Sequence, residues 1–205
     1  MALTIRPADF IKVKVIDFLI EKFDGVVIGD EVKYGSSRKV VDLLALYRGE
    51  TYAIEIKSAK DDLRRLPEQI SEYSKIFDHT LIFTTKDHLS KIKKISKDKV
   101  SLFVFGACNK IEGNLLEKTN NVQKKEMLAT MNAFFIRRNI NISQFRDSDE
   151  IRKKAMRYKK KDIHFLLFKY FMDKCLDPYE LFLKERGYKT EIDDLILLSN
   201  RIKVG

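Results

Sequence analysis

The stretch that decides the fold is RKVVDLLALYRGETYAIEIK, residues 38–57. It predicts two strands joined by a tight turn at residues 48–50, because apolar residues fill both halves and a glycine lies between them. Strands that are apolar at nearly every position are normally covered on both faces of their sheet. The charged exceptions inside the two predicted strands are Asp42 in the first and Glu55 and Lys57 in the second.

These three charged side chains are expected to share one patch. Glu55 and Lys57 project from the same face, since side chains alternate along a strand. We place residues 49 and 50 at the centre of the turn. Asp42 then pairs with Lys57 and lies diagonal to Glu55, roughly 7 Å away at the backbone. Carboxylates are rarely buried without a partner or a metal ion, so the sequence predicts two carboxylates and a lysine converging inside a sheet.

An isolated Glu-x-Lys is common and usually forms a solvated salt bridge on an outer strand. Here the apolar surroundings and a third charge in register favour a catalytic site instead. Asp42 followed by Glu55-Ile56-Lys57 resembles the signature of the PD-(D/E)xK nuclease superfamily, which has an acidic residue on one strand and Glu-x-Lys on the next. The proline of that signature is absent, and Val41 stands in its place.

The resemblance implies a restriction-endonuclease-like α/β fold, with a mixed central sheet flanked by helices. It implies one or two Mg²⁺ or Mn²⁺ ions held by Asp42, Glu55 and the Ile56 carbonyl, because hard oxygen ligands suit these ions. Lys57 would position the attacking water or stabilise charge on the phosphate. The resemblance is strongest over residues 31–105, about a third of the chain.

Neighbouring residues extend the predicted site. Glu31, on the preceding predicted strand, is either a further metal ligand or an exposed edge glutamate. Gln69 and Tyr73 share a helix face, and their spacing resembles the extra motif of the RecB-type branch of the superfamily. Gln69 would orient the substrate or the lysine, whereas Tyr73 fits a core stripe better. Arg64 and Arg65 are either phosphate contacts or solvated loop charges.

Periodicity and turn residues predict the elements around this motif. We expect helices over residues 8–23, from near 67 onward and over 89–96, with strands over 26–32, 80–84 and 100–106 and a loop at 33–37. This order predicts a nuclease-like core over residues 1–108. Residues 109–205 are predicted to form a helical, basic C-terminal region, with helices over 122–136, 162–174, 179–186 and 192–202. The aromatic helix over 162–174 fits packing on the core better than an interface.

A basic run in the C-terminal region is either a solvated face or a surface that contacts a phosphate backbone. The strongly basic composition of the chain favours the second interpretation. The predicted nucleic-acid contacts in this run are Arg152, Lys153, Lys154, Arg157, Lys159, Lys160 and Lys161, and Arg38 is added to them from the N-terminal half.

The overall composition agrees with a nucleic-acid enzyme. The chain of 205 residues has a net charge of +10 and is 44% hydrophobic, which permits one sizeable core and favours a polyanionic partner, nucleic acid before membrane. Cys108 and Cys175 show no metal spacing, and the three histidines, His79, His88 and His164, are expected at the surface or at its boundary. We see neither a signal peptide nor a membrane span, and expect a cytoplasmic protein.

These observations predict a metal-dependent nuclease that hydrolyses phosphodiester bonds, with DNA as the expected substrate. Repair, recombination, mobile-element and phage-defence roles are all compatible with that chemistry. The alternative is a protein that keeps the fold and binds nucleic acid, or serves as an accessory subunit, without hydrolysis. Composition leaves a homodimer or a larger complex open.

Overall fold

The computed structural model describes residues 7–97, 99–106, 110–142, 144 and 146–199. Its centre is a six-stranded mixed sheet in the order β1-β2-β3-β4-β5-β6. The first three strands are antiparallel, β3, β4 and β5 are parallel, and β6 returns antiparallel to β5. The strands are β1 (Val27–Tyr34), β2 (Lys39–Tyr47), β3 (Glu50–Lys57), β4 (His79–Thr85), β5 (Ser101–Phe105) and β6 (Ile111–Gly113).

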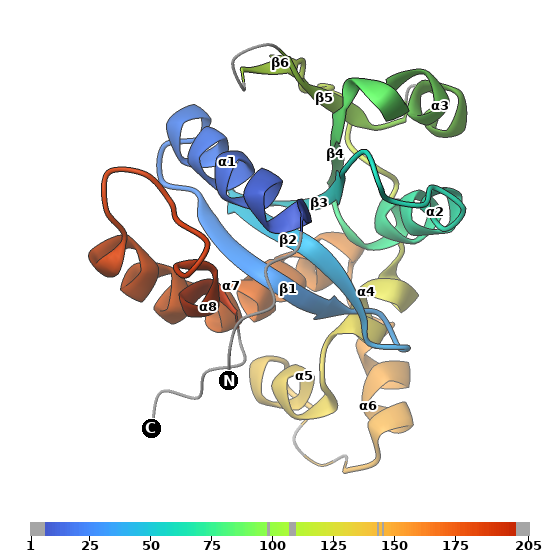
Figure 1. Ribbon diagram of the computed structural model, residues 1–205. Helices are drawn as coiled ribbons and strands as arrows, with labels where there is room; N and C mark the ends of the chain where they lie inside the picture. The colour runs from blue at the N-terminus through green and yellow to red at the C-terminus, as the bar shows by residue number, and fades with distance from the viewer. Residues whose placement is uncertain (1–6, 98, 107–109, 143, 145, 200–205) are drawn as a thin grey trace.

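Helices cover both faces of this sheet (Figure 1). The N-terminal α1 crosses one face, and the long C-terminal α7 runs along β1 on the other. The predicted mixed α/β fold with a helical C-terminal region is confirmed. The helices are α1 (Pro7–Lys22), α2 (Leu66–Ile76), α3 (Lys86–Ser96), α4 (Lys124–Thr130), α5 (Ala133–Asn139), α6 (Ser148–Ala155), α7 (Lys160–Glu185) and α8 (Leu195–Leu198).

The hairpin of β2 and β3 forms as predicted, but its register differs. Leu43 pairs with Ile54 and Tyr47 pairs with Glu50, so the central turn residues are 48 and 49 rather than 49 and 50. Arg48 and Gly49 have φ angles of 48° and 84°, and a two-residue hairpin turn with positive φ at both positions matches the twist of the strands. The predicted pairing is therefore wrong by two residues. A shift of two leaves each side chain on its expected face.

Two helix predictions in the C-terminal region are wrong. The helix expected over 122–136 is divided into α4 and α5, because the Asn132 side chain caps the second helix by accepting from the Phe135 N–H at 2.7 Å. The pieces expected over 162–174 and 179–186 form one 26-residue helix, α7, that continues through Pro178. Strand β6 was not predicted, and the part of the 192–202 prediction beyond residue 199 lies outside the described residues.

Helix α7 packs closely on the sheet. A Cβ on Gly29 of β1 would lie 2.6 Å from Cys175 Sγ, so only glycine permits this approach. Phe171 stacks on Phe77 with ring centroids 5.7 Å apart. Tyr170 and Phe171 are buried, whereas Phe165 is 69% exposed, so the aromatic helix belongs mostly to the core. Residues of α7 and of β1–β4 share one hydrophobic cluster.

The predicted boundary at Cys108 lies outside the described residues. Cys175 is free and buried, and burial raises the pKa of its thiol to about 12. Among the residues that the structure describes, no helix combines the length and the apolar character needed to cross a membrane.

Candidate active site

Glu55 is the centre of the polar cluster at the end of β3. Its side chain is buried, with 2% of the residue exposed. Lys57 Nζ and Gln69 Nε2 each donate to Glu55 Oε1 at 2.6 Å, and the Tyr73 hydroxyl donates to Oε2 at 2.5 Å. Three donors therefore fix one carboxylate, and a buried anion requires such compensation. The predicted residues Glu55, Lys57 and Gln69 are brought into direct contact.

Helix α2 presents two pairs of side chains to the sheet at i, i+4 spacing. Gln69 and Tyr73 reach Glu55, as described above. Glu68 and Glu72 immediately precede Gln69 and Tyr73 in the sequence. Each accepts a hydrogen bond from Lys39 Nζ of β2, at 2.5 and 2.6 Å. Pro67 lies in the first turn of α2, where its missing N–H costs little. The helix is thereby held beside β2 and β3 with its amide and hydroxyl donors over the carboxylate.

Asp42 lies where β2 and β3 separate beyond the Leu43–Ile54 pair. Its Oδ2 accepts from the Ile56 N–H at 2.9 Å, so the carboxylate substitutes for a strand partner. Burial and the negative charge of Glu55 raise the pKa of Asp42 to about 7, against opposing contributions from the Ile56 N–H and from Lys12 and Lys57. The two carboxylates repel one another in a site with low exposure to water.

The residues present fit a divalent metal ion. Residues paired in an antiparallel ladder exchange both N–H and C=O groups, so both groups of a strand residue point to one side. The Ile56 carbonyl therefore faces the side on which its N–H meets Asp42. Gln69 Oε1 is buried and has no hydrogen-bond partner among the described residues. A cation placed here would relieve the repulsion between the two carboxylates.

The described residues include no group of three or more His, Cys, Asp or Glu side chains that could hold a metal. A site with two carboxylates and a carbonyl would leave the remaining positions to water. Mg²⁺ commonly binds proteins through one or two carboxylates while keeping several waters.

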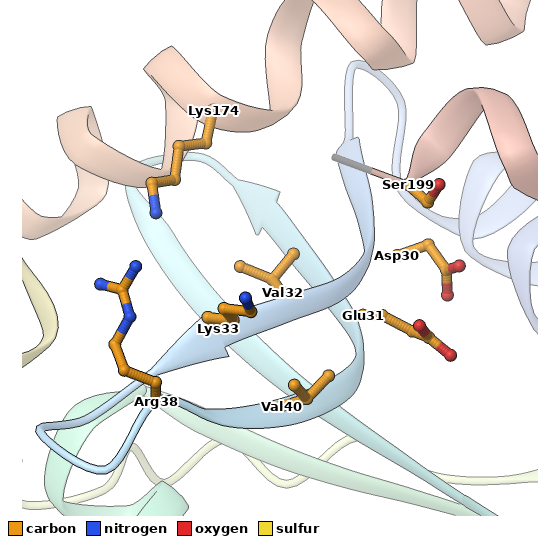
Figure 2. A pocket seen from close by; sticks show the side chains of 8 residues that line it. All are labelled: Asp30, Glu31, Val32, Lys33, Arg38, Val40, Lys174 and Ser199. Carbon is orange, nitrogen blue, oxygen red and sulfur yellow. The ribbon is translucent and has the colours of Figure 1, made fainter. Parts of the chain in front are cut away.

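Glu31 and Arg38 line a different pocket, of about 390 Å³, over β1 and α7. Figure 2 shows Arg38 and Lys174 pointing toward one another from the β1–β2 turn and α7, with Lys33 to one side of them on β1 and Glu31 directed away. Asp42 and Glu55 are not among the residues that line this pocket. The roles predicted for Glu31 as a metal ligand and for Arg38 as a nucleic-acid contact stay predictions.

Arg64 and Arg65 lie in the exposed loop that leads from β3 into α2. The Arg64 side chain pairs with Asp62, and its backbone N–H donates to the same carboxylate at 2.9 Å. Arg65 is the N-cap residue of α2 and its side chain is exposed. Both arginines lie past the same end of β3 as Lys57.

The basic run spans the end of α6 and the start of α7, near the opposite end of β3. His164, one turn beyond Lys160, binds Asp78, which in turn binds Thr51. Thr51 precedes Glu55 by four residues, about 13 Å along a strand. Arg152 is directed at backbone carbonyls of Leu128, Met131 and Ser148, and Lys160 donates to Asn121 at 3.0 Å. The exposed residues of the run are Lys153, Arg157, Lys159, Lys160 and Lys161.

Two contributors to the buried polar network were not predicted. Tyr73 belongs to the core, as expected, but its hydroxyl also binds Glu55. Lys12 of α1 forms a buried ion pair of 2.6 Å with Asp30 of β1 and lowers the pKa of Asp42. The available signal was a lysine interrupting the apolar face of an amphipathic helix, which indicates a buried partner.

A second polar cluster, also missed, lies at the start of β3. His164 Nε2 is 2.9 and 2.8 Å from the two carboxylate oxygens of Asp78. Asp78 Oδ2 accepts from the Thr51 N–H and hydroxyl at 2.8 and 2.9 Å. Nearby, His79 is buried and stacks on Tyr52 with ring centroids 4.4 Å apart. The expectation that His79 is a surface or boundary residue is wrong, because its ring completes this packing.

Comparison with known proteins places the chain in a family. No curated protein matches the sequence. A protein of unknown function from Silicibacter pomeroyi, SPO1766, has a similar structure at 18% identity and a TM-score of 0.45, over 59% of this chain and 78% of that one. Pyrococcus furiosus SfsA in complex with Ca²⁺ is similar at 13% identity and a TM-score of 0.31, over 56% and 62%. The family model of bacteriophage P4 protein cII matches residues 1–199, so the chain belongs to the bacteriophage P4 protein cII family.

Proposed function

We propose that this protein is a Mg²⁺- or Mn²⁺-dependent nuclease that hydrolyses phosphodiester bonds in DNA. The observation that carries the proposal is the convergence of Lys57, Gln69 and Tyr73 on Glu55 beside a second carboxylate, Asp42, whose pKa is raised. The resemblance to PD-(D/E)xK nucleases assigns the same positions to metal binding and catalysis. Two carboxylates with a neighbouring carbonyl and a lysine suit metal-assisted hydrolysis.

The chain's own residues would divide the work as follows. A bound Mg²⁺ or Mn²⁺ supplies a water of lowered pKa and neutralises charge on the phosphate. Asp42, Glu55 and the Ile56 carbonyl would hold this ion. Gln69 and Tyr73 fix the Glu55 carboxylate in one orientation. Lys57, whose Nζ lies 2.6 Å from Glu55 Oε1, would orient the water or stabilise the charge that develops on the phosphate oxygens.

A cleavage assay tests this proposal. The protein is incubated with single-stranded, duplex and branched DNA and with RNA, each with Mg²⁺, Mn²⁺ or EDTA. We expect cleavage of at least one DNA substrate with a divalent ion and none with EDTA. Glu55→Gln is the matched control, since it keeps the shape of the side chain but loses the charge. Cleavage that persists in EDTA, or that Glu55→Gln retains in full, contradicts the proposal.

One observation favours a second function, a nucleic-acid-binding or accessory protein that does no hydrolysis. Glu55 and Lys57 are 2% and 9% exposed and bind one another at 2.6 Å, an arrangement that also serves as a structural ion pair. Under this alternative, DNA binds with ordinary salt dependence, while no divalent ion produces cleavage or raises the Tm. The phage name of the family favours a mobile-element role among those compatible with either function.

A further inference from the structure

The loop between β3 and α2, the start of α2, and helix α3, which follows β4, line an open pocket of about 560 Å³. β3 and β4 are parallel, and Lys57 is in register with Thr84, whose hydroxyl donates to the Lys57 carbonyl at 3.1 Å. The pocket therefore lies past the same strand ends as Lys57.

The charges around this pocket leave an excess of cations. Asp61 accepts from the Ser58 N–H at 2.6 Å, and Asp62 is engaged by Arg64, so both acids already have partners. Lys91 and Lys94 on α3 line the pocket, are exposed, and form no ion pair within the part of the chain that the structure describes. With Asp62 paired to Arg64, the two lysines still outnumber the remaining acid, Asp61, on the wall of this pocket, and this excess of positive charge favours an anionic ligand.

His88 supplies a second, independent indication of a ligand. It lies one helical turn before Lys91 on α3 and lines the same pocket. Both of its ring nitrogens are buried and lack a hydrogen-bond partner among the described residues. A buried donor without an acceptor is destabilising. His88 lines the pocket, so a turn of its ring would bring an imidazole N–H to a phosphate oxygen bound there.

We propose that His88, Lys91 and Lys94 form a subsite for a backbone phosphate of the nucleic acid, adjacent to the phosphate that is cleaved. The assignment rests on the proposed function for the identity of the polymer, but it concerns binding alone. The residues bind phosphate oxygens and not base edges, so the subsite contributes equally to the affinity for all DNA sequences.

The test measures affinity without chemistry. Binding of a labelled DNA oligonucleotide is followed by fluorescence anisotropy in EDTA over a series of salt concentrations. Lys91→Gln/Lys94→Gln is compared with Lys86→Gln/Lys93→Gln, which removes the same charge from the same helix at exposed positions outside the pocket. We expect the first pair to weaken binding about 3- to 10-fold and to lower the salt slope by about 1–2, and the second pair to do much less.

Replacement of the histidine separates a ligand contact from a structural role. His88→Phe keeps a ring but removes the donors. We expect weaker DNA binding with an unchanged or higher Tm, because an unsatisfied buried polar group is lost. A lower Tm with unchanged affinity would assign His88 to the fold alone.

Three outcomes overturn the proposal. The first is an equal loss of DNA affinity in the two double-lysine variants, and the second is an unchanged affinity in both. The third is that millimolar inorganic phosphate displaces the oligonucleotide as effectively as unlabelled DNA does. The last result indicates a site for a free anion. A wild-type protein that cleaves nothing, while the pocket variants lose affinity, removes the nuclease proposal and leaves this one standing. If wild type cleaves DNA and the pocket variants bind it normally, the subsite proposal is removed and the nuclease proposal stands.

Discussion

Strand β3 has a buried carboxylate cluster at each end, and the two clusters are built in opposite ways. At its start, Asp78 accepts from the Thr51 N–H, the Thr51 hydroxyl and His164. Burial alone raises the pKa of Asp78, but these partners outweigh it and the pKa is lowered. Near the end of β3, Asp42 has the Ile56 N–H and a like-charged neighbour, Glu55, and its pKa is raised.

This difference separates a cluster that stabilises the fold from one that is suited to chemistry. Asp78 has the partners that its negative charge requires, so nothing further is needed from a ligand. The positive charge around Asp42 and Glu55 does not balance their two negative charges. A carboxylate pKa raised by burial and by a like charge is frequent at functional sites. Variants at the two ends of β3 should therefore fail in different assays.

The largest expected effect concerns cleavage at the Lys57 end. Lys57→Ala should lower the cleavage rate by a factor of about 10²–10⁴, the range of a positioned acid–base or electrostatic group. DNA affinity should remain nearly unchanged, because one lysine is a small part of a net charge of +10. Initial rates and anisotropy measure the two quantities. His164→Gln, at the other end of β3, is the control and should retain cleavage below its own Tm; an equal loss there would remove the distinction between the clusters.

The next effect is a loss of stability at the Asp78 end. Asp78→Asn should lower the free energy of unfolding by about 1.5–3 kcal/mol, the range for hydrogen bonds to charged groups. Urea denaturation measures it. The hydrogen bond and charge of Asp78 raise the pKa of His164, so this contribution is present below the ordinary histidine value of 6.5 and is lost as the pH rises through the raised pKa.

The lowered pKa of Asp78 sets the acid limit of the same contribution. The stability that Asp78 contributes is present above the ordinary aspartate pKa of 3.8 and is lost as the pH falls through the lowered pKa of Asp78. The difference in stability between wild type and Asp78→Asn should therefore be greatest between these limits. A difference that does not vary with pH would show that the carboxylate acts without the histidine.

A smaller effect, of opposite sign, is expected for Asp42. Its pKa is raised to about 7, so the stability that it contributes is present below its ordinary value of 3.8 and is lost as the pH rises through 7. Without metal at pH 8, Asp42→Asn should be more stable than wild type by roughly 1–2 kcal/mol, because the asparagine removes the repulsion from Glu55 but also weakens the hydrogen bond with the Ile56 N–H. Thermal melts in EDTA at pH 5 and pH 8 measure this.

Added Mg²⁺ or Mn²⁺ should raise the Tm of wild type by mass action, and the asparagine variant should lose that shift. An unchanged Tm of wild type at millimolar metal, together with a less stable variant, would mean that Asp42 is a structural cap of Ile56 and not a ligand.

The smallest expected effect concerns the basic run near the Asp78 end. Replacing Lys159, Lys160 and Lys161 with glutamine should reduce the salt slope of DNA binding by about 1–2 if the run follows the phosphate backbone. The number is less than three because Lys160 also donates to Asn121. An unchanged slope would identify the run as a solvated surface, and would leave the Lys57 end as the DNA-binding side.

Much of this arrangement was available from the sequence, because it depends on local patterns. The hairpin of β2 and β3 and the shared side of Glu55 and Lys57 follow from alternation along a strand, which a register error of two residues does not disturb. The placement of Gln69 follows from helix geometry and the position of Pro67. The turn was misplaced because positive φ at Arg48 is not indicated by its residue type.

The parts that could not be predicted depend on contacts between distant residues. Lys12 with Asp30, and His164 with Asp78, join segments 18 and 86 residues apart. Each partner alone has an ordinary alternative at the surface. The continuation of α7 through Pro178 likewise depends on burial of Cys175, Tyr179 and Phe182 against the rest of the core, which outweighs a proline's local preference to end a helix.

The packing of α7 on β1 also bears on how the chain folds during synthesis. Gly29 and Phe77 are made long before Cys175 and Phe171, the residues that cover them. Ribosomes add roughly 5–20 residues per second, so α7 is synthesised on the order of several seconds after the strands that it covers. During that interval the face of β1 that receives α7 is exposed as an apolar surface beside an unpaired strand edge, the type of surface that aggregates or engages chaperones.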